Sequence, residues 1–162
     1  MYPKTHLIFG PLFAGLIWLF FPSISFFGFF LIVASSVLID VDHYLYYVWL
    51  RKDWNLRRAY NWSIEIDNIT LKLPVEKSRE YKNFIFIFHG IEFWLILIIL
   101  IPLNKIFIFI LLGIAIHMAL DFFEIYKRKS PPSTKLSIIY NFIKNKNRKS
   151  VNLLWEQHKK NH

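Results

Sequence analysis

Residues 106–123 read IFIFILLGIAIHMALDFF, and this stretch decides the class of fold that we expect. Helices that cross the hydrocarbon core of a bilayer need about 20 mostly apolar residues. The ionisable side chains of the stretch are His117 and Asp121, which lie four residues apart near its C-terminal end. Such groups are costly at membrane depth and mark a functional site by default. The stretch therefore predicts a membrane-spanning helix that carries a polar pair at one end.

Three further apolar stretches cover about residues 7–21, 23–39 and 84–103. The whole chain of 162 residues is 55% hydrophobic and contains 17 Phe, a composition typical of membrane proteins. We read four spans from this pattern. The sequence has no Cys, so it excludes disulfides, thiolate metal sites and thiol nucleophiles.

The basic residues predict how the spans are oriented. Eight Lys and Arg lie between Arg51 and Lys82 and ten between Lys127 and Lys160, whereas Lys105 is the single one expected on the opposite side. By the positive-inside rule, both termini and the middle loop are then cytoplasmic and the chain resides in the cell membrane. The net charge of +9 fits anionic lipid headgroups, and nothing else in the sequence favours nucleic acid as a partner.

Two segments outside the spans have patterns of their own. Residues 62–66 and 69–73 alternate apolar and polar side chains around Asp67 and Asn68, which predicts a two-stranded β-hairpin. After Ser130–Ser133, apolar residues recur at helical spacing among lysines, which predicts a basic amphipathic helix at the headgroups.

The expected fold is therefore an all-α integral membrane protein: a four-transmembrane-helix bundle with a small cytoplasmic β-hairpin insert and a C-terminal basic amphipathic helix. We expect residues 1–129 to form the transmembrane domain, with the loop insert at 50–83. Residues 130–162 form the predicted cytoplasmic tail.

Eight ionisable side chains lie within or beside the apolar stretches, all near the expected cytoplasmic ends. They are His6, Asp40, Asp42, His43, His89, Glu92, His117 and Asp121. On a helix, residues three or four apart share a face. His89 with Glu92, and His117 with Asp121, therefore form two pairs whose side chains can converge on one ion. Mixed imidazole and carboxylate ligands suit one or two divalent transition ions, with Zn or Mn expected first. The simpler alternative is that these groups form hydrogen bonds between helices. A lone interfacial His such as His6 is more often a headgroup-facing or capping residue than a ligand.

Several of these motifs resemble those of a known family. Thr5-His6-Leu7 with Gly10, the run Asp40-Val41-Asp42-His43, and His117-x-x-x-Asp121 are similar to the membrane-bound metal-dependent hydrolase family of the LexA-regulated type. Two positions depart from the family pattern. Ile39 stands where the family has Pro, and Phe88-His89-Gly90-Ile91-Glu92 replaces an H-R-G-x-T-H-S element. The resemblance implies a divergent member, a hydrolase without an assigned substrate.

The function expected from these residues is metal-dependent hydrolysis, in which metal-activated water attacks an ester or phosphoester of an amphiphilic or lipid substrate. Asp40 and Glu92 are the expected catalytic groups, with Glu92 as ligand or general base. Arg51, Arg79 and Lys82 are candidates for binding an anionic substrate, although positive-inside topology is the stronger explanation of these cations. The alternative function is a small metal or proton transporter, or an ion-binding helper protein without hydrolytic activity.

Overall fold

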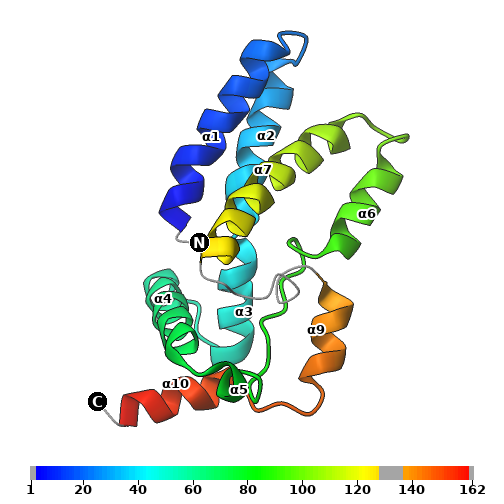
Figure 1. Cartoon of the computed structure of the whole chain (residues 1–162). Coiled ribbons are helices and arrows are strands. Elements are labelled where there is room, and N and C mark those ends of the chain that lie inside the picture. Colours follow the sequence, from blue (N-terminus) through cyan, green and yellow to red (C-terminus); the bar gives the residue numbers. More distant parts are fainter. Residues whose placement is uncertain (1–2, 128–136, 161–162) are drawn as a thin grey trace. The chain divides into compact units, whose positions relative to one another are not determined.

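A computed structural model describes residues 3–127 and 137–160 (Figure 1). These residues are largely helical and form no β-strand; one isolated parallel bridge joins Tyr81 and Lys149. The all-helical class predicted from the sequence is therefore found throughout the described chain.

Contacts divide the chain into two compact units. The first is drawn from residues 1–40 and 87–132, and the second from residues 41–86 and 133–162. The first contains α1 (Pro3–Phe20), α2 (Phe26–Leu38), α6 (Ile91–Leu100) and α7 (Ile106–Lys127). The second contains α3 (Val41–Arg51), α4 (Leu56–Lys72), α5 (Val75–Ser78), α9 (Ile138–Asn145) and α10 (Val151–Lys160). The predicted boundary between residues 129 and 130 lies outside the described residues.

In the first unit, α2 packs against α1 and α7, and α7 also contacts α6 (Figure 1). The approach of α7 to α2 is closest at Gly113. A Cβ atom at this position would collide with the Ser35 hydroxyl and the Ile32 carbonyl oxygen, and would lie 3.0 Å from the Ser36 amide nitrogen. Glycine thus lets the two helix backbones come together one turn before His117.

The outer faces of the first unit are apolar. Large exposed hydrophobic side chains include Leu19, Phe20, Phe26, Ile99 and Leu103. Among the described residues, two helical stretches are long and apolar enough to cross a membrane, Phe26–Arg51 and Ile106–Phe123. By length and composition, both stretches could cross a membrane. The core helix of a soluble protein can meet the same criterion.

The prediction of a four-helix transmembrane bundle is wrong. Two of the four apolar stretches form shorter helices, Thr5–Phe20 and Ile91–Leu100. A helix of ten residues is about 15 Å long, half the thickness of a hydrocarbon core. The stretch 84–103 fails because residues 84–90 are not helical and α6 begins only after its N-cap Gly90. The predicted multi-pass topology with both termini in the cytoplasm is not supported by these two stretches.

The predicted β-hairpin is also wrong, because residues 62–72 belong to α4. This helix begins at an Asn55 N-cap whose side chain accepts a hydrogen bond from the Arg58 amide. Its buried side chains follow a spacing of three to four residues and not of two; they are Ala59, Trp62, Ile66 and Ile69. Asp67-Asn68 also lacks the glycine that favours a tight hairpin turn.

The core of the second unit is built around α4. Trp62 and Ile66 pack with Tyr47 and Val48 of α3 and with residues of α10. The helix α9 is held by its polar side: the Asn145 side chain accepts from the Asn83 amide at 2.7 Å and donates to the Asn83 carbonyl at 2.8 Å. On the same helix Phe142 and Ile143 are 72% and 66% exposed. α9 therefore buries asparagines and exposes apolar side chains.

Candidate metal centre

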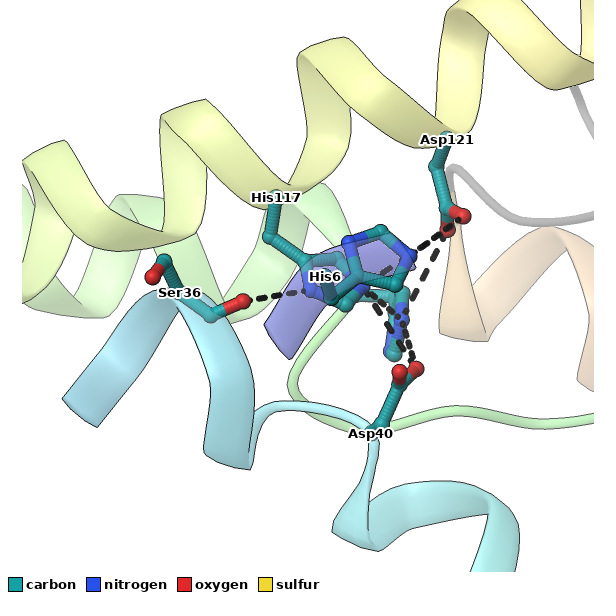
Figure 2. A network of polar contacts seen from close by, with 6 residues as sticks. His6, Ser36, Asp40, His117 and Asp121 are labelled. Atoms are coloured by element: carbon teal, nitrogen blue, oxygen red, sulfur yellow. Dashed lines mark hydrogen bonds and ion pairs between the residues drawn. The ribbon is translucent and has the colours of Figure 1, made fainter. Parts of the chain in front are cut away.

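Five of the eight predicted ligands come together inside the first unit (Figure 2). His6 lies in the first turns of α1, and Asp40 follows two residues after the end of α2. His89 directly precedes Gly90, the N-cap of α6. His117 and Asp121 lie one helical turn apart in the second half of α7. Segments far apart in the sequence therefore bring these side chains near one another.

The cluster is almost completely removed from solvent. His6 and His117 are 0% exposed, and His89 and Asp121 are 1% exposed. The side chain of Asp40 is 15% exposed and is the most accessible of the five. Burial of two carboxylates is unfavourable unless cationic groups or hydrogen bonds compensate their charge. Hydrogen bonds, protonated imidazoles or a bound cation can supply this compensation.

His117 is oriented by the backbone of α2. Its Nδ1 lies 2.9 Å from the carbonyl oxygen of Ser36, as Figure 2 shows. A carbonyl oxygen only accepts hydrogen bonds, so Nδ1 carries the proton and donates it. In the neutral ring, Nε2 then holds the free lone pair. A metal-ligating histidine is commonly fixed in this way, with one nitrogen bound to a backbone carbonyl and the other directed at the ion.

Three polar atoms lie within 4 Å of His117 Nε2. This nitrogen lies 3.2 Å from His89 Nε2, 3.5 Å from Asp40 Oδ1 and 3.8 Å from Asp121 Oδ2. His89 Nε2 lies 3.8 Å from both carboxylate oxygens. Ligands of a tetrahedral zinc ion, with bonds of about 2.0–2.1 Å, are about 3.3–3.4 Å apart. The buried His and Asp groups could therefore hold a metal ion.

His6 packs against the face of the His117 ring. The two imidazole rings stack with centroids 3.8 Å apart and planes inclined by 13°. His6 Nε2 is 3.5 Å from Asp121 Oδ1. Neither ring nitrogen of His6 has a hydrogen-bond partner within the described part of the chain.

Three predicted ligands are not among these five residues. Glu92, in the first turn of α6, is half-buried and joins none of the His and Asp clusters found among residues 3–127 and 137–160. Asp42 and His43 belong to the second unit, in the first turn of α3. Asp42 is buried, and the His43 ring stacks on Phe86 with centroids 4.1 Å apart. Their roles as ligands or base stay predictions.

The predicted substrate-binding cations also lie in the second unit. Arg51 donates to Asn152 Oδ1 at 2.6 Å and Glu156 Oε1 at 3.1 Å, and its guanidinium lies 4.4 Å from the Trp155 ring centroid. These contacts give Arg51 a structural role. Arg79 and Lys82 are exposed. Their role in substrate binding stays a prediction.

Asp53, in the same unit, has a lowered pKa. The Tyr47 hydroxyl donates to Asp53 Oδ2 at 2.6 Å, and this hydrogen bond holds the pKa of the carboxyl below its usual value. Arg58 lies 3.4 Å from the same oxygen and adds to the effect. Asp53 therefore stays ionised and partly neutralises the cations around it.

Sequence reasoning missed two residues that shape the site. Ser36 supplies the backbone carbonyl that orients His117, and Gly113 allows α7 to reach that carbonyl. Any residue has a carbonyl, so no sequence signal marks Ser36 as the acceptor. Gly113 did carry a signal, as a small residue one turn before His117 in an otherwise bulky apolar helix.

We compared the chain with protein-family models, curated proteins and solved structures, and none of them matches it. The family resemblance therefore rests on the short motifs alone.

Proposed function

We propose that this chain is a metal-dependent hydrolase whose ion is held by His89, His117, Asp40 and Asp121. One observation carries the proposal: His89 Nε2 and His117 Nε2 lie 3.2 Å apart and between 3.5 and 3.8 Å from the two carboxylate oxygens. These spacings suit ligands around one small cation.

A purely structural hydrogen-bond network explains the same residues less well. Nδ1 of His117 already donates to Ser36, so neutral His117 has no proton left for His89 or the carboxylates. The contacts of its Nε2 to Asp40 and Asp121 would then bring a lone pair toward two anionic groups. A divalent cation between these groups removes this repulsion and balances both negative charges.

The residues of the cluster have distinct tasks in this proposal. Ser36 and Gly113 keep His117 in place. His89 and Asp121 are buried and would keep water away from their side of the bound ion. Asp40 is the most accessible member and so lies where a substrate would approach. A bound divalent ion would lower the pKa of a coordinated water and polarise an ester oxygen.

Several features support an amphiphilic substrate at a membrane. The first unit exposes large apolar side chains on its helices, and its α7 includes one of the two stretches able to cross a bilayer. Extended apolar surface on a monomer marks a site of membrane or protein contact. Phe142 and Ile143 of α9 are exposed beside Lys144 and Lys146, a combination suited to anionic headgroups. We therefore place the hydrolase at a membrane, acting on an ester or phosphoester of a lipid-like molecule.

Metal content tests the ion site directly. Protein purified in detergent and reconstituted with MnCl₂ or ZnCl₂ should retain bound ion after desalting, as measured by mass spectrometry of the metals. The variants His117→Ala and Asp121→Asn should lose at least one ion per chain. His158→Ala, in α10, is the matched control and should retain the full content. Equal metal content in all four proteins, or none in the wild type, would refute the proposed centre.

Hydrolysis is tested separately with amphiphilic substrates in mixed micelles. We expect turnover of a phosphoester or carboxylic ester that chelator abolishes and added ion restores, with no turnover by His117→Ala. Bound metal without hydrolysis, together with ion flux into sealed vesicles, would instead favour the transporter function. Turnover that survives in His117→Ala would show that another site, or a contaminant, is responsible.

A further inference from the structure

We infer that the cluster holds two ions, the second bound by His6 and joined to the first by the carboxylate of Asp121. This inference rests on the proposed function, because it adds an ion to the same centre. It also narrows the substrate class to phosphoesters.

The relative orientation of the rings indicates that His6 and His117 do not share one ion. The lone pair of an imidazole nitrogen lies in the ring plane, so a ligated ion lies close to that plane. The His6 and His117 planes are nearly parallel and stacked, with centroids 3.8 Å apart and an angle of 13°. A single ion cannot lie in both planes. The His89 and His117 planes cross at 77°, which allows those two rings to meet at one ion.

Asp121 directs its two oxygens to different histidines. Its Oδ2 lies 3.8 Å from both His89 Nε2 and His117 Nε2, whereas its Oδ1 lies 3.5 Å from His6 Nε2 (Figure 2). This is the arrangement of a bridging carboxylate, one oxygen for each ion. Two-metal sites hold their ions about 3.5–4 Å apart. The stacked rings of His6 and His117 have centroids 3.8 Å apart, close to this separation of the ions. Each ring would therefore direct one nitrogen to its own ion.

His6 provides the independent sign of a missing partner. Its side chain is fully buried, yet neither nitrogen is hydrogen-bonded within the described residues. A buried imidazole whose nitrogens make no hydrogen bond has lost the hydration of these polar atoms without replacing it. A bound ion between His6 Nε2 and Asp121 Oδ1 would satisfy the ring.

Two adjacent ions favour one class of reaction. A pair of ions can stabilise both the attacking and the leaving oxygen of an in-line displacement at phosphorus. In the hydrolysis proposed, water forms a new P–O bond, the P–O bond to the alcohol breaks, and the alcohol oxygen takes up a proton. We therefore assign phosphoesters of amphiphilic alcohols as the substrate class, in preference to carboxylic esters.

The test counts ions and detects whether they interact. Wild-type protein reconstituted with MnCl₂ should bind two Mn²⁺ per chain and give the electron paramagnetic resonance spectrum of an exchange-coupled pair. His6→Phe keeps a ring over His117 but has no nitrogen ligand, so it should bind one Mn²⁺ with an uncoupled six-line spectrum. His158→Phe, outside the cluster, should behave as the wild type. Phosphoester turnover should fall at least tenfold more than carboxylic ester turnover in His6→Phe.

The possible failures are distinguishable. One uncoupled Mn²⁺ in the wild type and the same in His6→Phe would overturn the second site and leave the single-ion centre intact. No bound Mn²⁺ in the wild type would overturn both proposals. Because the wild-type spectrum alone decides between one ion and two, the test does not depend on the folding of the variant.

Discussion

Single polar side chains determine the local geometry in both units. In the first, one hydrogen bond to Ser36 fixes which nitrogen of His117 faces the cluster. In the second, the side chain of Asn145 binds both backbone polar atoms of Asn83, as a neighbouring strand would. Asn145 is buried, so these bonds are shielded from competing water.

We expect Asn145→Ala to destabilise the second unit by about 1–3 kcal/mol, because the Asn83 amide and carbonyl would lose their partners in a buried setting. Asn147→Ala removes an exposed amide from the turn after α9 and is the matched control. Thermal unfolding midpoints of both variants, compared with the wild type, provide the measurement. A decrease of equal size in the two variants would contradict the role given to Asn145.

The residues of the cluster could be predicted in part. His6, Asp40, His89, His117 and Asp121 were identified because ionisable groups in apolar sequence need partners, and the structure brings these five together. The same reasoning also selected Glu92, which joins no cluster in the described chain. Spacing indicates which side chains share a face and cannot show where a loop such as residues 84–90 directs them.

Among the helices, the contact of α2 with α7 has the clearest effect on the site. Gly113 and the Ile32 carbonyl are in direct backbone contact, and Ser36 and His117 lie one turn further along their helices. The distance between the two helices therefore decides whether the hydrogen bond to His117 can form.

We expect Gly113→Ala to push α7 away from α2 and to weaken metal binding by about 10–100-fold, the usual effect of losing a partner that orients a ligand. The control is Gly15→Ala in α1, where an added Cβ meets nothing within 4 Å. Titration with Mn²⁺ measures both affinities. Wild-type affinity in Gly113→Ala would show that the close approach does not support the site.

Helix positions were easier to predict than helix lengths. The run 106–123 was found as part of α7 because it is apolar, long and without a break. Residues 84–90 are equally apolar, yet Gly90 and the packing of Phe84 on Tyr46 keep them out of the helix. The hydrophobic residues of 62–72 fit both the alternation of a strand and the spacing of a helix. Burial of Trp62 and Ile66 in the core of the second unit favours the helix.

For the whole molecule, the division into two units separates the candidate metal centre from the core around α4. The five clustered residues belong to the first unit, and the cluster of buried apolar residues around α4 belongs to the second. Ion binding should therefore stabilise the chain unevenly.

We expect chelation to lower the stability of the first unit selectively. A ligand at 100 times its dissociation constant stabilises the state that binds it by about 2.7 kcal/mol. Hydrogen exchange with and without Mn²⁺ should show loss of protection in α7 on ion removal, and little change in α4. Equal loss in both helices would mean that the ion stabilises the entire chain.

The order of synthesis follows from where the clustered side chains lie in the sequence. Asp121 leaves the ribosome 115 residues after His6, behind α6 and most of α7. A nascent chain shorter than this has no complete set of ligands. The candidate metal centre can therefore form only after α7 has been translated, which separates its assembly in time from the synthesis of α1 and α2.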